Sequence, residues 1–569
     1  MSRPRRYGRR RRRQQKGGCV TYLVLAITLF ILALLGCGGL VVVRELLGRL
    51  QTPSAPTQVT LTLAYSPEKG ELLRTLVEEF NAQRLQTPSG LPMVVELVEV
   101  EPELMIERAV QGEFQAINPD SSIWLDPLDQ QWAEKTGQEG AFLAGWTVRY
   151  AVSPVVIAMW RDVAQEMGYP DRPLGWSDLL ARAESDPDFK WSHPSTSSAS
   201  GLLATLAEFY AGAGKTRGLT VEDVQAQATL DYVAAIEKTI RYYGEGEWAV
   251  VQQVLQNGPD YLDAFVCQEQ LVVYANQRGA DLVAIYPVEG SLWEDHPLVL
   301  LELPELTNEQ RLVFARLAEF LRSPESQQKV LAAGYRPADP TIPLDGPGSP
   351  LTPANGVDPT QPKTALQIPG RSVIEVVRNV WWYTKRHTNV YLVVDVSGSM
   401  RGEKLENVKQ ALRTFVDQIK GPKERVGLII FSSDVQILVP LDQLERNRED
   451  LLQAIEGLEA RGDTALLDGV DRAYEELISL GDRERINGIV VMTDGLENAS
   501  RVTLGRLADK IQRGNAGGET VPVVIFAIAY GDDADMATLR ILAQASGGQA
   551  REGTLETIQK LYKILSTYF

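Results

Sequence analysis

The chain has 569 residues, of which 44% are hydrophobic and 23% are charged, so it has an ordinary globular composition and is long enough for two or more domains. Its charge is uneven, because residues 1–16 hold nine Arg or Lys and no acid, whereas the rest holds 48 basic and 74 acidic residues, a net charge of −26. An acidic body of this kind argues against nucleic acid as the partner.

An uncharged segment follows this basic tail. Residues 17–43 carry no charge and are bounded by Lys16 and Arg44. As a helix rising about 1.5 Å per residue, the segment would span roughly 40 Å, which is enough to cross a bilayer with some tilt. The positive charge before it predicts a single-pass membrane protein, with residues 1–16 as a cytoplasmic tail and the body outside the cytoplasm.

The segment leaves one alternative open. Leu34-Leu35-Gly36-Cys37 resembles a bacterial lipobox, in which the cysteine is lipidated after cleavage. The run stays apolar as far as Val43, where lipoproteins usually turn polar, so an uncleaved anchor is preferred. Both readings keep the body attached to the membrane. Cys267 is the only cysteine in the body, so no disulfide within a domain is possible.

Residues 57–340 alternate predicted strands and helices. Strand patterns cover 59–63, 93–100, 155–160, 282–286 and 298–301. Helical patterns cover 72–80, 201–210, 221–243 and 309–321. The alternation predicts an α/β fold with a largely parallel sheet, and about 280 residues favour two lobes over one.

Turns at the ends of these elements indicate which kind of α/β protein this region resembles. Tyr65-Ser66-Pro67 ends the first strand, Ser153-Pro154 precedes a central strand, residues 195–201 open a helix, and residues 286–291 follow a late strand. Together with residues 334–337, these turns resemble the two-lobed extracytoplasmic solute-binding proteins that feed bacterial transporters. Serines at helix N-termini can present polar groups to a solute, although helix capping explains any single one. The candidate solute-binding residues are Ser66, Ser122, Ser197, Ser198, Tyr286 and Glu289.

Residues 341–387 are predicted to link two domains. Residues 337–362 contain eight prolines, which predicts an extended spacer. Residues 372–387 predict an amphipathic helix with a broad apolar face, which would pack either on the first domain or on the second.

Oxygen-bearing side chains follow two predicted buried strands in residues 388–569. The first strand ends in Asp395-Val396-Ser397-Gly398-Ser399, the second ends in Thr493-Asp494-Gly495, and Thr464 lies in a loop between them. Ligands in parallel sheets sit beyond the carboxyl ends of the strands, so both carboxylates are expected on one rim. Oxygen donors of this kind suit a hard divalent cation.

The order of these residues resembles the metal-ion-dependent adhesion site of von Willebrand factor type A domains, over roughly residues 388–569. The resemblance implies a Rossmann-like fold and Mg²⁺ (or Mn²⁺ or Ca²⁺) held directly by Ser397, Ser399 and Thr464. It implies that Asp395 and Asp494 hold the cation directly or through water. Neutral hydroxyls leave such a cation able to accept an Asp or Glu from a protein partner.

The expected function is therefore recognition by a membrane-anchored extracytoplasmic protein and not catalysis. The alternative is an anchored solute-binding receptor of an ABC-type transporter, with the type A domain as an accessory. A hydrolase is a third reading, but the sequence offers no catalytic constellation for it. The scattered histidines, His193, His296 and His387, are predicted to be capping or surface residues.

Overall fold

The computed structural model describes residues 57–244, 246–419, 421, 423–515, 521–531 and 533–554. The predicted basic tail, the predicted transmembrane helix 17–43 and the lipobox cysteine Cys37 lie outside the described residues. In the part that is described, no helix combines the length and the apolar character that crossing a membrane requires. Cys267 is buried and unpaired, as its isolation in the sequence predicts.

A first lobe is built on a five-stranded sheet. Its strands are β1 (Val59–Tyr65), β2 (Met93–Glu99), β3 (Ala116–Asn118), β4 (Ala144–Arg149) and β10 (Pro297–Leu301). Its helices are α2 (Gly70–Ala82), α3 (Pro102–Gln111), α4 (Leu125–Thr136), α12 (Asn308–Leu321) and α13 (Pro324–Ala332), with short 3-10 turns η1 (Pro67–Lys69) and η2 (Ser122–Trp124). The strand order is β2-β1-β3-β10-β4. The apolar stripe of α2, predicted from its spacing, is buried.

A second lobe carries the segments between β4 and β10, together with the later strand β11. Its strands are β5 (Ala151–Trp160), β6 (Trp191–Ser192), β7 (Ala264–Gln268), β8 (Leu282–Ile285), β9 (Trp293–Glu294) and β11 (Arg336–Pro337). Its helices are α5 (Arg161–Glu166), α6 (Trp176–Ser185), α7 (Ala199–Ala213), α8 (Val221–Gln225), α9 (Gln227–Lys238), α10 (Glu247–Asn257) and α11 (Glu269–Asn276), with the 3-10 turn η3 (Gly258–Asp260). The strand β5 is central and pairs with β7, β8, β9 and β11.

Two predictions for this region are wrong. The sheets are mixed and not largely parallel: β1 pairs with β3 in parallel, but β10 runs antiparallel to β3 and β4, and β5 runs antiparallel to all four of its partners. Apolar periodicity identifies strands but does not encode their direction. The single helix predicted for 221–243 is two helices, because Ala226 adopts an extended backbone with ψ 131°.

The described residues before Thr60 and residues 86–93 form a small unit of their own. Within it, the Val59 amide donates to the carbonyl of Pro92 at 2.8 Å, and the Thr87 amide donates to the carbonyl of Leu91 at 2.9 Å. These bonds close a tight polar turn.

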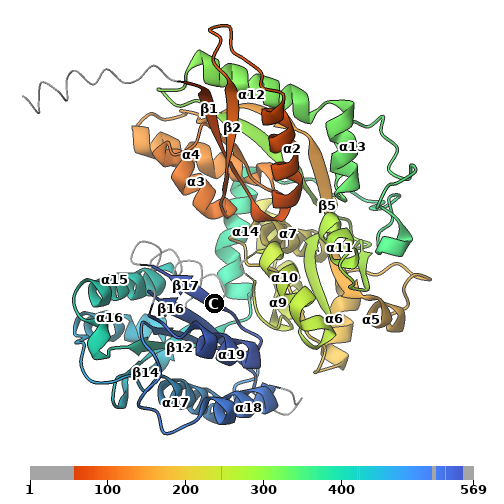
Figure 1. Cartoon of the computed structure of the whole chain (residues 1–569). Coiled ribbons are helices and arrows are strands. Elements are labelled where there is room, and N and C mark those ends of the chain that lie inside the picture. Colours follow the sequence, from red (N-terminus) through yellow and green to blue (C-terminus); the bar gives the residue numbers. More distant parts are fainter. Residues whose placement is uncertain are drawn as a thin grey trace, which may run out of the picture. The chain divides into compact units, whose positions relative to one another are not determined.

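The proline-rich segment, for which the sequence predicts an extended spacer, is a strap docked on the second lobe. It contains the 3-10 turn η4 (Pro353–Asn355), and the amide of Ala284 in β8 donates to the Gly356 carbonyl at 2.7 Å. Leu351 and Val357 are buried, which explains why the segment stays on the second lobe. The following helix α14 (Arg371–Thr384) packs against α7, α8 and α9, so it belongs with the first domain (Figure 1).

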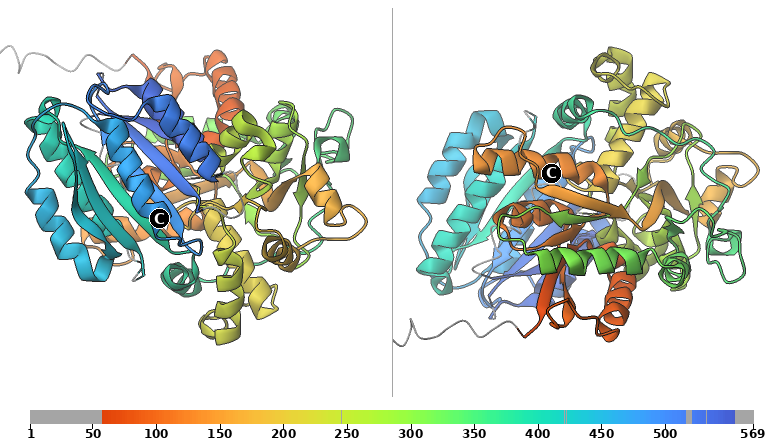
Figure 2. Two further views of the ribbon diagram at one scale, coloured as in Figure 1. Left: turned by 90° about the horizontal axis from the view of Figure 1, so that it is seen from below. Right: turned by 90° about the horizontal axis from the view of Figure 1, so that it is seen from above.

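The C-terminal region is a six-stranded sheet between two layers of helices (Figure 2). Its strands are β12 (Thr388–Asp395), β13 (Arg425–Phe431), β14 (Val435–Gln443), β15 (Ile486–Thr493), β16 (Val523–Tyr530) and β17 (Ala550–Gly553). Its helices are α15 (Glu403–Gln418), α16 (Leu444–Glu456), α17 (Leu466–Ser479), α18 (Leu504–Asn515) and α19 (Met536–Ser546), with the 3-10 turn η5 (Gly398–Met400). The order is β14-β13-β12-β15-β16-β17, and only β14 pairs antiparallel.

Successive residues of the central strands point to opposite layers. In β12, Leu392 packs with the apolar face of α15 and α16, whereas Val393 packs with that of α17, α18 and α19. Because both faces are covered, these strands are continuously hydrophobic. The sheet is therefore rigid, and the loops at the carboxyl ends of its strands start from fixed points.

Candidate metal centre

Two carboxylates lie at the carboxyl edge of the C-terminal sheet, as the sequence predicts. Asp395 is the last residue of β12 and Asp494 directly follows β15. The two strands are parallel neighbours, with Val394 opposite Met492. Both side chains are buried, so each carboxylate is held in a low-dielectric setting beside the other.

The two serines of the first loop connect these carboxylates. The hydroxyls of Ser397 and Ser399 are 2.9 Å apart, and Ser399 Oγ donates to Asp494 Oδ1 at 2.6 Å. The Ser397 amide donates to Asp395 Oδ1 at 2.7 Å, and the hydroxyl of Thr493 donates to Asp395 Oδ2. Four of the five predicted ligands thus belong to one continuous hydrogen-bonded group.

The loop that carries Thr464 also lies beside the Asp395 and Asp494 carboxylates at the carboxyl edge of the sheet. Gly462 has φ +81°, a conformation that favours glycine, and its carbonyl accepts from the Gly398 amide at 3.0 Å. A Cβ at Gly495 would lie 3.4 Å from Thr464 Oγ1 and 3.6 Å from Ser399 Oγ, so both hydroxyls face that glycine. The structure therefore brings all five predicted side chains to one rim.

Burial raises the pKa of the Asp395 carboxyl above its ordinary value, and the Asp494 carboxylate adds to this effect. Hydrogen bonds from Thr493 and Ser397 act in the opposite direction. Burial and the neighbouring carboxylate therefore both disfavour the charged form of Asp395.

Sequence reasoning missed Lys404, which is in the first turns of α15. Its ammonium Nζ lies 2.5 Å from Asp494 Oδ2, while Ser399 takes the other oxygen of the same carboxylate. The Lys404 side chain is about one-third exposed and Asp494 is buried. A lysine at the second position of the helix that follows the serine-rich loop is the signal that could have identified it, since that position lies close to the loop.

Each of the six predicted solute-binding residues makes a local hydrogen bond in the structure. Ser66 Oγ donates to Glu68 at 2.7 Å, and Ser198 Oγ caps α7 by accepting from the Gly201 amide at 3.1 Å. The Ser122 amide donates to Asp295, the Ser197 hydroxyl contacts that of Ser195, the Tyr286 hydroxyl donates to Glu269, and Glu289 accepts from the Trp176 amide. In the described part of the chain, no hydrogen bond joins any two of the six.

A different group of side chains lies where the two lobes meet. This interlobe acidic cluster comprises Glu68, Asp120, Glu247 and Glu294, all buried. Gln268 in β7 donates from its amide to Glu247 and, at 2.6 Å, to Glu294. Sequence patterns do not predict the cluster, because its members are far apart in the chain and come from a loop, helices and a strand of both lobes.

Burial raises the pKa of Asp120 to about 7, and the neighbouring Glu68 carboxylate adds to the shift. Burial and the charge of Glu68 hold the pKa of Glu247 well above its ordinary range, and burial with the charge of Glu247 does the same for Glu294. Lys69 is the nearest cation, 3.1 Å from Glu68. Burial therefore disfavours the charged forms of Asp120, Glu247 and Glu294.

The histidine prediction is wrong for two of the three residues. His193 and His296 are fully buried, and only His387 is partly exposed. His296 Nε2 lies 2.8 Å from the amide oxygen of Gln268, which can only accept, so Nε2 carries the proton. Burial and Lys69 hold the pKa of His296 well below its ordinary value.

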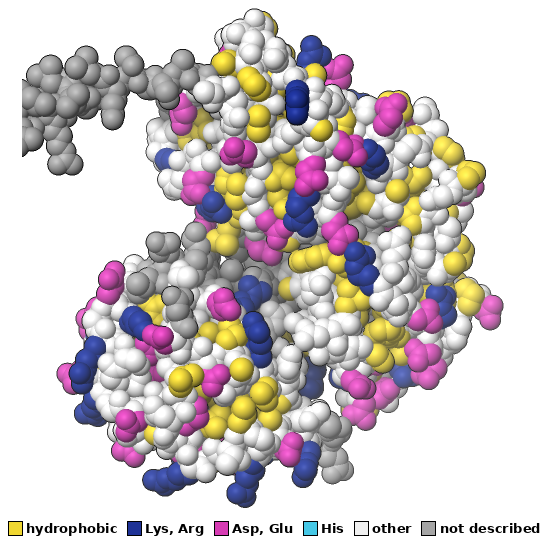
Figure 3. All heavy atoms as spheres, in the orientation of Figure 1, with side chains coloured by type: hydrophobic (Ala, Val, Ile, Leu, Met, Phe, Trp, Pro, Cys, Tyr) yellow, Lys and Arg dark blue, Asp and Glu magenta, His cyan; other side chains and the backbone are white. Residues whose placement is uncertain are grey.

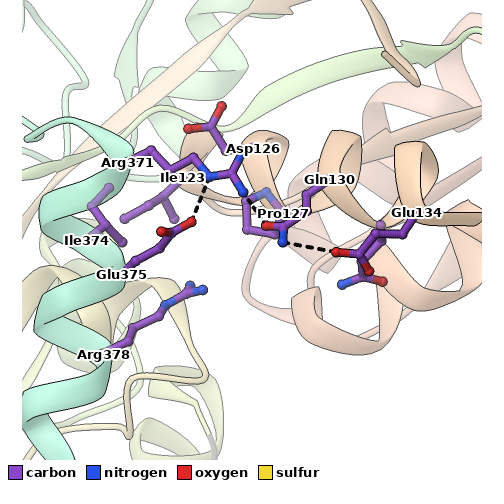
Figure 4. A pocket seen from close by; sticks show the side chains of 10 residues that line it. Ile123, Asp126, Pro127, Gln130, Glu134, Arg371, Ile374, Glu375 and Arg378 are labelled. Atoms are coloured by element: carbon purple, nitrogen blue, oxygen red, sulfur yellow. Dashed lines mark hydrogen bonds and ion pairs between the residues drawn. The ribbon is translucent and has the colours of Figure 1, made fainter. Parts of the chain in front are cut away.

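A cavity of about 250 Å³ lies between α4 and α14 (Figure 4). Arg371 donates to Glu375 at 2.7 Å and to Gln130 at 2.5 Å, and Gln130 donates to Glu134 at 3.1 Å. No residue predicted from the sequence to bind a ligand lines this cavity. Of these bonds, the one from Arg371 to Gln130 crosses the cavity, whereas the other two lie within α14 and within α4.

Comparison with protein families finds two matches. Residues 61–336 match the sequence profile of the bacterial extracellular solute-binding proteins. Residues 389–563 match that of the von Willebrand factor type A domain.

Relatives match over one or both parts. An uncharacterised protein of Mycobacterium tuberculosis strain H37Rv is 23% identical over 462 residues, which is 75% of this chain and 64% of that protein. An uncharacterised protein of Synechocystis is 28% identical over 32% of this chain and 40% of that protein. Human inter-alpha-trypsin inhibitor heavy chain H4 is 28% identical over 29% of this chain and 18% of that protein. The chain thus spans less than two thirds of each relative.

Solved structures match the two parts separately. A periplasmic thiamin binding protein is 13% identical, with a TM-score of 0.41, over 58% of this chain and 98% of that one. A von Willebrand factor type A protein from Catenulispora acidiphila is 20% identical, with a TM-score of 0.28, over 32% of this chain and 43% of that one. The assignment of the two domains rests on the family profiles.

Proposed function

Because the chain joins a domain of the bacterial extracellular solute-binding protein family to a von Willebrand factor type A domain, we propose that it recognises a protein partner outside the cytoplasm through a divalent cation. The observation that carries this proposal is the hydrogen-bonded group formed by Asp395, Ser397, Ser399 and Asp494, with Thr464 facing it. Five oxygen-bearing side chains from three loops are a donor set that fits Mg²⁺, or Mn²⁺ or Ca²⁺ in its place.

Each residue has a defined task in this proposal. Ser397, Ser399 and Thr464 would hold the cation by their hydroxyls, and Asp395 and Asp494 directly or through water. When bound, the cation supplies an open coordination position that an Asp or Glu of the partner can fill. Lys404 would have to leave Asp494 Oδ2, and its exposure gives it room to move into solvent. Recognition of this kind is binding and needs no catalytic group.

The membrane anchor belongs to the same proposal. The uncharged segment 17–43 would cross the membrane once, with the basic residues 1–16 on the cytoplasmic side, and would hold both domains at the cell surface. Lipidation at Cys37 is the alternative form of attachment. A family of extracellular binding proteins supports an extracytoplasmic location for the body.

Surface charge supports a specific contact over a diffuse ionic one. Over the face shown in Figure 3, Lys and Arg side chains are interspersed with Asp and Glu side chains. A mixed face on a body with a net negative charge gives little long-range attraction to an anionic polymer. The partner would then be selected at the rim of the sheet.

Calorimetric titration of Mg²⁺ into the full chain tests the metal site. We expect binding at one rim site, which Asp395→Ala and Ser397→Ala abolish, and which Asp434→Ala retains, because Asp434 is exposed and outside the donor set. Unchanged Mg²⁺ binding in both site variants would refute the proposal. Circular dichroism of each variant confirms that the fold persists.

A second candidate function is that of a solute-binding receptor, which the interlobe acidic cluster favours. Buried carboxyls at the meeting point of two lobes suit a small organic cation, whose charge would offset the cost of ionising them. At pH 8, small amines should raise the melting temperature of the full chain and dicarboxylates should not. Glu247→Gln should remove the rise in melting temperature. If neither amines nor dicarboxylates change the melting temperature of the full chain, this candidate function is excluded.

A further inference from the structure

Three fully buried side chains of the second lobe face one another. His193 follows β6, Glu208 is in α7 and Glu237 is in α9. His193 Nε2 lies 3.7 Å from Glu208 Oε1 and 3.6 Å from Glu237 Oε2. One ligand atom from each residue lies within 4.8 Å of the other two. This buried triad is separate from the rim of the C-terminal sheet and from the interlobe acidic cluster.

The proton positions leave the triad without a donor at its centre. His193 Nδ1 lies 2.6 Å from the carbonyl of Pro194, which can only accept, so Nδ1 carries the proton and Nε2 presents a lone pair. His193 Nε2 and both carboxylate oxygens of Glu208 have no hydrogen-bond partner. Natively buried polar atoms are nearly always partnered, so three such atoms in one place call for a missing ligand.

The surroundings hold Glu237 in place. Its Oε2 accepts from the hydroxyl of Tyr243 at 2.6 Å, and its Oε1 accepts from Trp381 Nε1 at 2.8 Å. These outer bonds fix the carboxylate in the way that hydrogen-bonded neighbours orient metal ligands.

We propose that His193, Glu208 and Glu237 bind a first-row transition-metal dication, with Zn²⁺ as the fitting probe. An imidazole nitrogen with carboxylate oxygens is a donor set that Zn²⁺ accepts. Two carboxylates and a dication are electrically neutral together, which a dry core requires.

The distances agree with this assignment. Tetrahedral zinc at about 2.0–2.1 Å from its ligands needs neighbouring ligand atoms about 3.4 Å apart. The observed separations of 3.6 and 3.7 Å need to contract by only a few tenths of an ångström. Since both oxygens of Glu208 are unpartnered, either one can bind the metal beside His193 and Glu237.

The metal would fasten α14 to the second lobe. Trp381, which bonds Glu237, is in α14, and its ring meets that of Tyr243 edge to face at a centroid distance of 5.1 Å. Fixing Glu237 therefore fixes the indole that anchors this helix. The role is structural, and it does not depend on the metal site at the rim of the C-terminal sheet.

The experiment uses the full chain carrying Asp395→Ala, so that the rim site is absent whether or not it binds metal. After treatment with chelator and titration with Zn²⁺, elemental analysis of the gel-filtered protein should find one zinc per chain. Adding Glu208→Gln or His193→Gln should lower this to below about 0.1, whereas Glu222→Gln, an exposed residue of α8, should leave it unchanged. Zinc retained in both triad variants, or absent from Asp395→Ala itself, would overturn the assignment.

Thermal melting separates metal binding from proton sharing. Glu208→Gln removes a buried, unpartnered carboxylate, so the metal-free variant should melt at or above the temperature of its parent. The parent should gain stability with Zn²⁺ and the variant should not. If Zn²⁺ leaves the parent's melting temperature unchanged, the three side chains share a proton and the proposal fails. Should a variant not fold, X-ray absorption of the zinc-loaded parent decides, and a spectrum without an imidazole ligand overturns the proposal.

Discussion

The ammonium of Lys404 lies 2.5 Å from Oδ2 of Asp494, a carboxylate whose other oxygen accepts from Ser399. The lysine thus neutralises one of the two acids at the rim of the C-terminal sheet. Any dication that binds there competes with a charge that the protein itself supplies. A dication would have to displace this ammonium in order to reach Asp494 Oδ2.

Lys404→Met should therefore strengthen Mg²⁺ binding. A partly exposed ion pair contributes on the order of 1 kcal/mol, so we expect the Mg²⁺ dissociation constant to fall about fivefold. Calorimetry on the full chain measures this, with Lys409→Met, which is paired to Glu406 away from the rim, as the matched control. A weaker Mg²⁺ affinity in Lys404→Met would instead make the lysine part of the binding site.

Thr464→Ala should weaken partner binding without unfolding the domain. Thr464 is in a loop whose backbone is fixed by Asn498, so the change removes one hydroxyl and leaves the loop in place. Loss of such a ligand should cost about 10- to 100-fold in metal affinity. Pull-down from surface extracts measures how much partner is captured by the wild type, by the Thr464→Ala variant, and by the wild type in the presence of EDTA.

The salt response of that pull-down is an internal control. A metal–carboxylate contact is short-ranged, so moderate salt should reduce capture much less than EDTA does. A partner captured equally by wild type, by Thr464→Ala and in EDTA would place recognition elsewhere on the chain.

The mass of the mature protein depends on how the protein is attached to the membrane. If residues 17–43 are an uncleaved anchor, the membrane-extracted protein keeps its arginine-rich tail and carries no lipid. Intact mass spectrometry should then give the mass of the complete sequence. A product that begins at Cys37 with added acyl mass would establish the lipoprotein form.

Asp120→Asn should stabilise the first domain above neutral pH. The pKa of Asp120 is about 7 in the folded chain, against about 3.9 in an unfolded one. An acid whose pKa is raised by folding stabilises the fold fully below pH 4 and loses that contribution as the pH rises to 7. A shift of this size corresponds to a few kcal/mol.

Melting of the full chain at pH 5 and pH 8 measures this effect. Asn keeps the oxygen that accepts from Trp124 Nε1 and carries no charge. The gain in melting temperature should be large at pH 8 and small at pH 5, and exposed Asp126→Asn should show neither. An equal gain at both pH values would mean that charge burial at Asp120 is not the cause.

Much of the C-terminal domain follows from the sequence alone. Asp395 and Asp494 each follow a continuous apolar run, and such runs form parallel strands whose carboxyl ends share one edge. The side chains of the rim were therefore predictable from local patterns. The helical stripe of α2 was predictable for the same reason, since a period of 3.6 residues marks one buried face.

Tertiary structure alone decided the rest. Contacts between residues far apart in the chain determine three features: the direction of β10, the docking of the proline-rich strap, and the proximity of His193 to Glu208 and Glu237. Apolar periodicity says that a residue is buried but not which partner it meets. Lone glutamates within helical patterns are ordinarily solvent-facing, and only the packing of α7 against α9 turns two of them inward beside a histidine.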